Sequence, residues 1–113
     1  MKVAIVGSRA IKEVDLSSFI GDEVTEIVSG GACGVDSVAK EYAQNNSIPY
    51  KELLPQYSKY GKAAPLVRNK QIVDYSDFVL IFWDGESRGT KHVIDYCKDV
   101  NKMHKVIICS QDR

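Results

Sequence analysis

The sequence predicts an α/β fold in which a parallel sheet is covered by helices on both faces. Short, almost wholly apolar runs recur along the chain, and the clearest span residues 3–6 and 78–83. Such continuous runs are typical of parallel strands that are buried on both faces. Segments with apolar residues at helical spacing lie between the runs. Strands that alternate with helices predict right-handed crossovers and therefore a parallel sheet.

Length and composition limit the class of protein. A chain of 113 residues is long enough for one hydrophobic core, so we expect a single domain over residues 1–113. Lys and Arg together number 15, as do Asp and Glu, which argues against a general nucleic-acid binder. The three cysteines form no CxxC pair, which is typical of free thiols in a reducing compartment. No signal peptide precedes the first apolar run. No apolar stretch approaches the about 18 residues that a membrane span needs. These features predict a cytoplasmic protein without a membrane span.

The first half of the chain predicts two strands and two helices. The strand at residues 3–6 is followed by a short amphipathic helix at residues 16–20, which a glycine stops. The β-branched run at residues 24–28 predicts the second strand. After a glycine-rich turn, apolar residues recur from Val35 at i, i+3, i+4, i+7 and i+8. This stripe predicts a helix that lasts to about Asn46.

The second half predicts three more strands and two helices. Residues 48–54 read as a strand whose early proline indicates an edge position. Residues 55–64 form a polar loop, and loops of this length are often functional lids. A helix follows with Pro65 in its first turn. The run at residues 78–83 is the most apolar and is predicted as the central strand. A further amphipathic helix leads to the last strand at residues 105–109.

Numbered in chain order, these strands predict a sheet of about five mostly parallel strands in the order 3-2-1-4-5. The fold expected is a Rossmann-like three-layer sandwich with a topological switch point between strands 1 and 4. Three loops, at residues 7–9, 29–36 and 84–90, then converge at the carboxyl edge of neighbouring strands. Open α/β sheets bind ligands at such an edge, so the sequence predicts a ligand site there.

The loop that reads SGGACGVD, residues 29–36, is the strongest local motif. Its glycines allow a sharp turn and let a ligand approach the backbone. The first amides of the following helix have no partner within the helix, and the helix dipole is positive at that end. Together these features predict a phosphate site, although a tight connection that binds nothing has the same signature. The residues expected to contact the ligand here are Ser29, Gly30, Gly31 and Gly34.

The other two loops supply further candidates. After the first strand we expect Gly7, Ser8 and Arg9 to contact the ligand, and after the fourth Gly85, Ser87, Gly89 and Thr90. Ser87 and Thr90 can donate hydrogen bonds to a phosphate or cap the next helix, and the two roles are compatible. Arg9 and Arg68 can grip a phosphate bidentately. Asp36 lies in the first turn of its helix, where a carboxylate interacts favourably with the helix dipole. A structural capping role is therefore expected, with a contact to a ribose hydroxyl as the alternative.

Several reactive side chains carry weaker predictions. Cys33 lies near a helix N-terminus, which lowers a thiol pKa, but no neighbour in the sequence serves as its base. His92 can act as an acid or base, although an ordinary polar helix position is the favoured interpretation. His92 and His104 have no partner at metal-ligand spacing, so no metal site is predicted. Tyr57 and Trp83 can stack on a base, and Trp83 fits a core position equally well.

Four blocks occur in order across nearly the whole chain: VAIVGSR from Val3, SGGACGVD from Ser29, Arg68-Asn69, and SRGT from Ser87. This ordered set resembles the SLOG superfamily, which joins the DNA-processing DprA/SMF proteins to the Lonely Guy proteins. The small size and the WDG ending resemble its stand-alone branch related to YpsA and YspA. The resemblance implies a Rossmann-like fold that binds nucleotides or nucleotide-derived ligands, and it adds Arg68 and Asn69 to the ligand contacts.

The resemblance leaves three functions open. The first is binding of a nucleotide-like small molecule. No cofactor is expected, and a homo-oligomer, either a dimer or a tetramer, is compatible with this function. The second is Lonely Guy-like hydrolysis of the N-glycosidic bond of a nucleoside monophosphate. The motif of the Lonely Guy proteins is PGGxGTxxE, whereas in this chain no glutamate follows Gly89-Thr90. This difference leaves His92 and Asp95 as the catalytic candidates. The third is DprA-like binding of single-stranded DNA, which the zero net charge disfavours.

Overall fold

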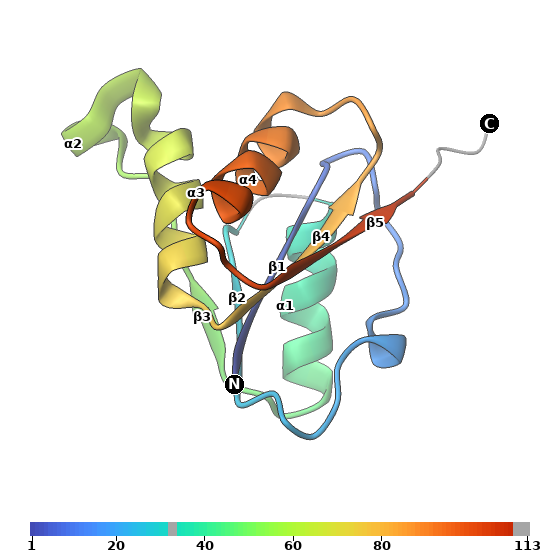
Figure 1. Cartoon of the computed structure of the whole chain (residues 1–113). Helices are drawn as coiled ribbons and strands as arrows, with labels where there is room; N and C mark the ends of the chain where they lie inside the picture. The colour runs from blue at the N-terminus through green and yellow to red at the C-terminus, as the bar shows by residue number, and fades with distance from the viewer. Residues whose placement is uncertain (32–33, 110–113) are drawn as a thin grey trace.

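The computed structural model describes residues 1–31 and 34–109, and over these residues the chain forms a five-stranded sheet flanked by helices (Figure 1). The strands are β1 (Lys2–Gly7), β2 (Glu26–Ser29), β3 (Tyr50–Glu52), β4 (Phe78–Trp83) and β5 (His104–Ile108). Their order is β3-β2-β1-β4-β5, and every neighbouring pair is parallel. The predicted α/β class and strand order are confirmed.

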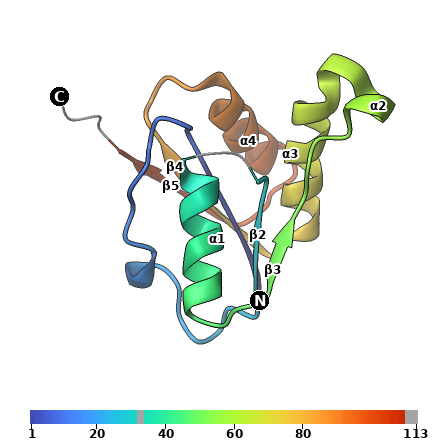
Figure 2. The ribbon, with the colours of Figure 1, turned by 180° about the vertical axis from the view of Figure 1, so that it is seen from behind.

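Helices cover both faces of the sheet. They are η1 (Leu16–Ser18), α1 (Val35–Asn45), α2 (Tyr57–Tyr60), η2 (Gly61–Ala63), α3 (Ala64–Tyr75) and α4 (Arg88–Asp99). In Figure 1, α3 and α4 lie in front of the sheet and α1 lies behind it. Figure 2, seen from behind, shows α1 in front with η1 beside it. The arrangement is the Rossmann-like three-layer sandwich expected. No helix in the described part of the chain combines the length and the apolar character that crossing a membrane requires.

The alternation of side chains along each strand explains why the inner strands are wholly apolar. In β1, Val3 and Ile5 belong to the core beneath α1, with Ala39 of that helix. Ala4 belongs to the opposite core, with Val73 of α3. Successive residues of a strand point to opposite faces, so a strand between two helical layers must be apolar at every position.

Two predictions about single elements are wrong. The central strand is β1, which pairs with β2 and β4, whereas β4 lies one position nearer the edge. A wholly apolar run indicates burial on both faces of the sheet, a property that β1 and β4 share, so it does not identify the middle strand. The helix expected at residues 16–20 is one 3₁₀ turn, Leu16–Ser18. Asp15 caps this turn by accepting a hydrogen bond from the Ser17 amide at 3.1 Å.

The polar loop predicted at residues 55–64 contains two short helical turns, α2 and η2, which we call the arm. Figure 1 shows the arm extending from the body of the molecule beside α3. None of its residues is buried. Because the arm contributes nothing to the core, its sequence has no apolar period from which helical turns can be predicted. The other elements begin and end within about two residues of their predicted bounds.

Candidate functional site

A cleft of about 450 Å³ opens at the carboxyl edge of β1 and β4, between α3 and the first turn of α4. Its volume lies within the range of roughly 300–1,000 Å³ that small-molecule sites occupy. Most of the predicted contact residues line it: Gly7, Ser8, Arg9, Gly30, Asp36, Arg68, Asn69, Ser87, Gly89 and Thr90. The three loops that the sequence places at this edge therefore do converge, at the switch point of the sheet.

The floor of the cleft is a short chain of hydroxyl groups. Ser8 is buried, and its Oγ lies 3.5 Å from Thr90 Oγ1. The amide of Asp84 donates a hydrogen bond to Ser8 Oγ at 3.3 Å, and Ser87 Oγ donates one to Thr90 Oγ1 at 3.2 Å. These bonds join the loop after β1 to the loop after β4. Because a hydroxyl both donates and accepts, such a chain can turn toward a bound anion by rotating its protons.

The first turn of α4 is capped by its own loop. Ser87 Oγ accepts a hydrogen bond from the Thr90 amide at 3.4 Å, so the capping role is the one that the structure shows for Ser87. Asp84 Oδ1 accepts hydrogen bonds from the amides of Glu86 and Ser87, both at 2.9 Å. Trp83 Nε1 donates to the Ser87 carbonyl at 3.0 Å, and its indole does not line the cleft. The loop is therefore a fixed scaffold for the helix N-terminus.

Arg68 is the principal cation of the cleft. Its Nη1 donates a hydrogen bond to the Gly30 carbonyl at 2.8 Å, and its Nε donates one to Asn69 Oδ1 at 3.0 Å. Burial lowers the pKa of Arg68, whereas the nearby charge of Asp36 opposes this change. A guanidinium remains charged under either influence. The cleft thus contains a half-buried cation that is already oriented by the glycine-rich loop.

The charges around the cleft are mixed. Arg68 is accompanied by the exposed Arg9, and the two carboxylates that line the cleft are those of Asp36 and Asp84. Asp36 is 7% exposed in the first turn of α1, where its charge favours the helix dipole. A ligand that carries both an anionic group and hydroxyl groups suits this set better than a simple anion does.

The glycines of the SGGACGVD loop have different roles. A Cβ on Gly30 would lie 2.6 Å from Arg68 Nη1, so this glycine allows the guanidinium to approach the backbone. Gly31 and Gly34 have φ angles of 74° and 75°, which favour glycine, and neither lines the cleft. A Cβ on Gly31 would instead meet Leu54 at 2.7 Å. Of the three glycines, only Gly30 faces the cleft.

Ser29 and Gly85, also predicted as contacts, lie outside the cleft lining. Ser29 is buried, and its Oγ lies 2.5 Å from Tyr50 Oη. Burial raises the pKa of Tyr50 to about 12. Gly85 has a φ angle of 86° and is exposed in the turn after β4. These two residues shape the strand ends that support the site.

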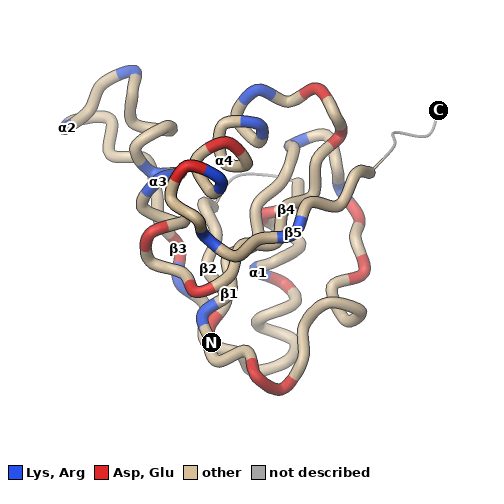
Figure 3. Tube along the Cα trace, viewed as in Figure 1, with Lys and Arg blue, Asp and Glu red and all other residues tan. Residues whose placement is uncertain are grey.

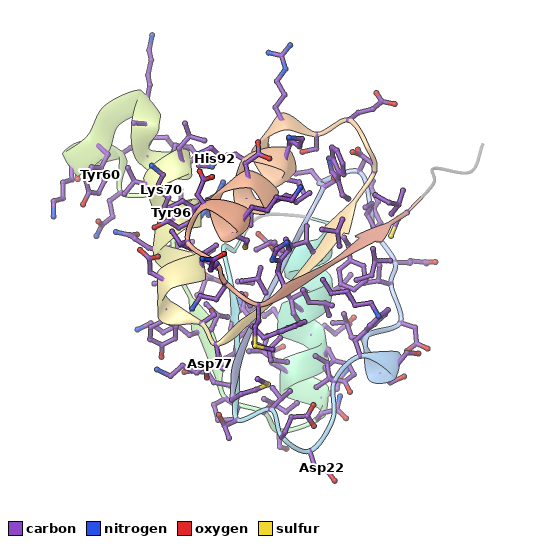
Figure 4. The ribbon with its side chains drawn as sticks, in the orientation of Figure 1. Asp22, Tyr60, Lys70, Asp77, His92 and Tyr96 are labelled. Atoms are coloured by element: carbon purple, nitrogen blue, oxygen red, sulfur yellow. The ribbon has the colours of Figure 1, made fainter. Side chains whose placement is uncertain are left out.

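The catalytic candidates His92 and Asp95 do not line the cleft. Figure 4 shows His92 on α4 in the region of Lys70 and Tyr96, and within the described part of the chain its buried Nδ1 has no hydrogen-bond partner. Asp95 is exposed and accepts hydrogen bonds from Lys91 Nζ at 2.8 and 3.0 Å. Cys33 lies outside the described residues. Among residues 1–31 and 34–109, no group of three or more His, Cys, Asp or Glu side chains is arranged to hold a metal ion.

Asp84 and Leu66 line the cleft, although the sequence did not single them out. Asp84 carries a signal in the sequence that could have identified it. Asp84 directly follows the buried strand β4, at the edge where ligands bind. Leu66 lies in the first turn of α3, two residues before Arg68, and remains 44% exposed.

The Asp84 turn predicts a specific dependence of stability on pH. Hydrogen bonds from the backbone amides, first that of Ser87 and then that of Glu86, lower the pKa of Asp84 below 3.8. A carboxyl group whose pKa is lower in the folded state stabilises the fold above its ordinary pKa, and this contribution disappears as the pH falls through the lowered pKa. We therefore expect Asp84→Asn to destabilise the protein near neutral pH and to have less effect near pH 3, as measured by urea unfolding.

The control is Asp22→Asn, because Asp22 is exposed and points away from the molecule in Figure 4. It removes the same charge without disturbing the turn after β4. If the two variants lose stability equally at both pH values, the amides of the turn do not hold Asp84 in its charged form.

Comparisons with family models, with curated proteins and with solved structures found no match. The resemblance of the sequence blocks to the SLOG superfamily therefore stays a prediction. The chemistry of the cleft is the basis on which a function can be proposed.

Proposed function

We propose that the chain binds a nucleotide or a nucleotide-derived ligand in the cleft at the carboxyl edge of β1 and β4. One observation above all supports this proposal. The half-buried guanidinium of Arg68 is fixed on the Gly30 carbonyl and lines the same cleft as the hydroxyl groups of Ser8 and Thr90. A cation and a set of hydroxyl donors around one cavity suit a phosphate ester.

In this proposal each part of the cleft contacts one part of the ligand. The phosphate lies at the first turn of α4, where the positive end of the helix dipole attracts an anion, with Gly89 leaving room for it. Arg68 and Arg9 supply the charge-assisted hydrogen bonds. The carboxylate of Asp36 accepts a hydrogen bond from a ribose hydroxyl. This division of roles uses the cations and an anion of the cleft together.

Binding without cleavage is favoured over the Lonely Guy-like hydrolysis. The catalytic candidates His92 and Asp95 do not line the cleft, and Asp95 is paired with Lys91. Asp84 does line it, but its pKa is lowered by the amides of its own turn. A carboxyl group that stays ionised is a poor general acid near neutral pH. Cleavage is tested directly by chromatography of each ligand after incubation.

A second candidate function is binding of single-stranded nucleic acid, which the charge of the arm and α3 supports. Residues 53–73 carry Lys59, Lys62, Arg68 and Lys70 and no acidic residue, although the whole chain has no net charge. Figure 3 shows the basic positions on the arm and along α3. A local basic surface with exposed tyrosine is typical of single-strand binders. Such binding is expected to weaken steeply as salt increases.

The main test is isothermal titration with AMP, GMP and UMP, followed by chromatography of the mixtures. We expect at least one nucleotide to bind and to remain intact. We expect Gly89→Ala to weaken that binding roughly tenfold or more, because a methyl group takes space at the helix N-terminus. The same change is expected to stabilise the fold by about 0.5 kcal/mol, since an added Cβ meets no atom within 4 Å and alanine favours a helix.

Gly21→Ala provides the matched control, because Gly21 is exposed, lies away from the cleft, and would contact only the flexible side chain of Glu23. A stable Gly89→Ala variant with unchanged affinity would remove the α4 N-terminus from the binding site. A wild-type protein that binds none of the three nucleotides would refute the proposal. Binding of a dT oligonucleotide alone would favour the second candidate.

A further inference from the structure

We propose that the arm of one molecule docks into a groove on a second copy of the same chain. The groove, which we call the acidic groove, is lined by Lys12, Glu13, Val14, Asp15, Val38 and Glu41. Neither the arm nor this groove lines the ligand cleft, so the contact is independent of the proposed function. A contact between two different surfaces of identical chains is heterologous, and its repetition produces a ring or a filament.

The arm is a projecting segment that the fold itself does not use for packing. Figure 1 shows it extending from the body of the molecule, and none of its residues is buried. Lys59 and Lys62 are exposed on it, and the Tyr57 side chain is 60% exposed. Residues 53–73 include no Asp or Glu. The arm therefore offers a partner a positively charged projection with an exposed aromatic ring.

The acidic groove has the opposite charge and a suitable shape. It is a hollow of about 430 Å³ between α1 and the segment that leads into η1. Three carboxylates line it, those of Glu13, Asp15 and Glu41, and all three residues are exposed. Within residues 1–31 and 34–109, none of the three forms an ion pair. Val14 and Val38 add apolar surface against which an aromatic ring can pack.

The charges of the chain are segregated, although they sum to zero. Residues 13–39 contain acidic side chains and no Lys or Arg, whereas residues 53–73 contain only basic ones. Figure 3 shows the acidic positions between β1 and β2 and the basic ones on the arm. In Figures 1 and 2 the arm and η1 lie on opposite sides of the molecule. The arm is therefore remote from the groove of its own chain, and the matching groove belongs to another copy.

Sedimentation velocity at high protein concentration tests whether the chain assembles in this way. At a salt concentration of about 30 mM, we expect a weight-average mass at least about twice the 12.6 kDa of one chain. At about 500 mM salt the mass should fall to that of the monomer, because salt screens attraction between exposed charges. A wild-type protein that is monomeric at low salt would overturn the proposal, as would assembly that persists at high salt.

Reversal of charge identifies the two surfaces. The arm variant is Lys59→Glu with Lys62→Glu, and the groove variant is Glu13→Lys with Glu41→Lys. Each variant alone is expected to be monomeric at low salt, because its arm and its groove then have the same charge. An equimolar mixture should assemble again, since the arm of each variant matches the groove of the other. All four positions are exposed, so the melting temperatures should change little.

The matched control is Lys91→Glu with Lys98→Glu, which reverses the charge of two exposed lysines on α4, outside both surfaces. We expect this control to assemble as the wild type does. Assembly of the arm variant or of the groove variant alone would overturn the proposal, as would a mixture that stays monomeric. If the wild type is monomeric and the arm variant loses binding of a dT oligonucleotide, the arm serves nucleic-acid binding instead of assembly.

Discussion

Replacing Arg68 with glutamine is expected to lower the affinity for a nucleotide at least tenfold and the free energy of unfolding by about 1–3 kcal/mol. The first effect follows from loss of the half-buried cation of the cleft. The second follows from loss of its hydrogen bonds to the carbonyls of Gly30 and Leu53, which leaves these acceptors without their charged donor. Titration calorimetry measures the first effect, and urea unfolding measures the second.

Two further variants separate charge from position. Lys105→Gln removes a cation that is exposed on β5 and does not line the cleft, so it should bind nucleotide nearly as the wild type does. Arg68→Lys keeps the charge but loses the planar fork, and we expect an intermediate affinity. If a folded Arg68→Gln protein binds with wild-type affinity, Arg68 serves only to attach α3 to the glycine-rich loop.

Replacing Gly7 with alanine is expected to lower the free energy of unfolding by about 2 kcal/mol or more, and the melting temperature by about 10 °C. A Cβ at this position would lie 2.6 Å from Val35 Cγ2 and 2.7 Å from the carbonyl oxygen of Phe82. Val35 begins α1, and Phe82 belongs to β4, which pairs with β1. Neither can move without shifting a helix or a strand, so the strain cannot be relieved by a side chain alone.

Differential scanning calorimetry tests this prediction, with Gly21→Ala as the control. A Cβ on Gly21 meets only the end of the Glu23 side chain, which is free to rotate away. We expect this control to melt within a few degrees of the wild type. Equal melting temperatures for the Gly7→Ala and wild-type proteins would mean that α1 can move away from β1 at little cost. Gly7 would then have no essential packing role.

The layers could be predicted from the sequence because they depend on burial, and the strand order because strands that alternate with helices imply right-handed crossovers. The run at residues 78–83 is apolar at every position, and this property reports two helical layers whatever the details of packing. The arm could not be predicted, since it buries no residue and its helical turns leave no period in the sequence. Burial leaves a pattern in a sequence, whereas exposed helical turns do not.

The site was predictable in its location but only partly in its residues. The loops converge because carboxyl ends of parallel strands meet at one edge, which the strand order already implies. The direction in which a glycine faces cannot be read from its identity, so Gly30 and Gly31 looked equivalent. The separation of His92 from the cleft could have been foreseen. It follows Thr90 by two residues, and helix positions two apart point in nearly opposite directions.

The neighbours of β1 have a consequence for the order in which the molecule folds. Its pairing with β4 joins residues far apart in the chain, as in the hydrogen bond from the Lys2 amide to Asp77, which spans 75 positions. The contact between Ser8 and Thr90 spans 82. Contacts of such separation close long loops and therefore form late. During synthesis, the residues before β4 lack the part of the cleft that the turn after β4 and the first turn of α4 supply, so the complete site forms only after nearly the whole chain has been made.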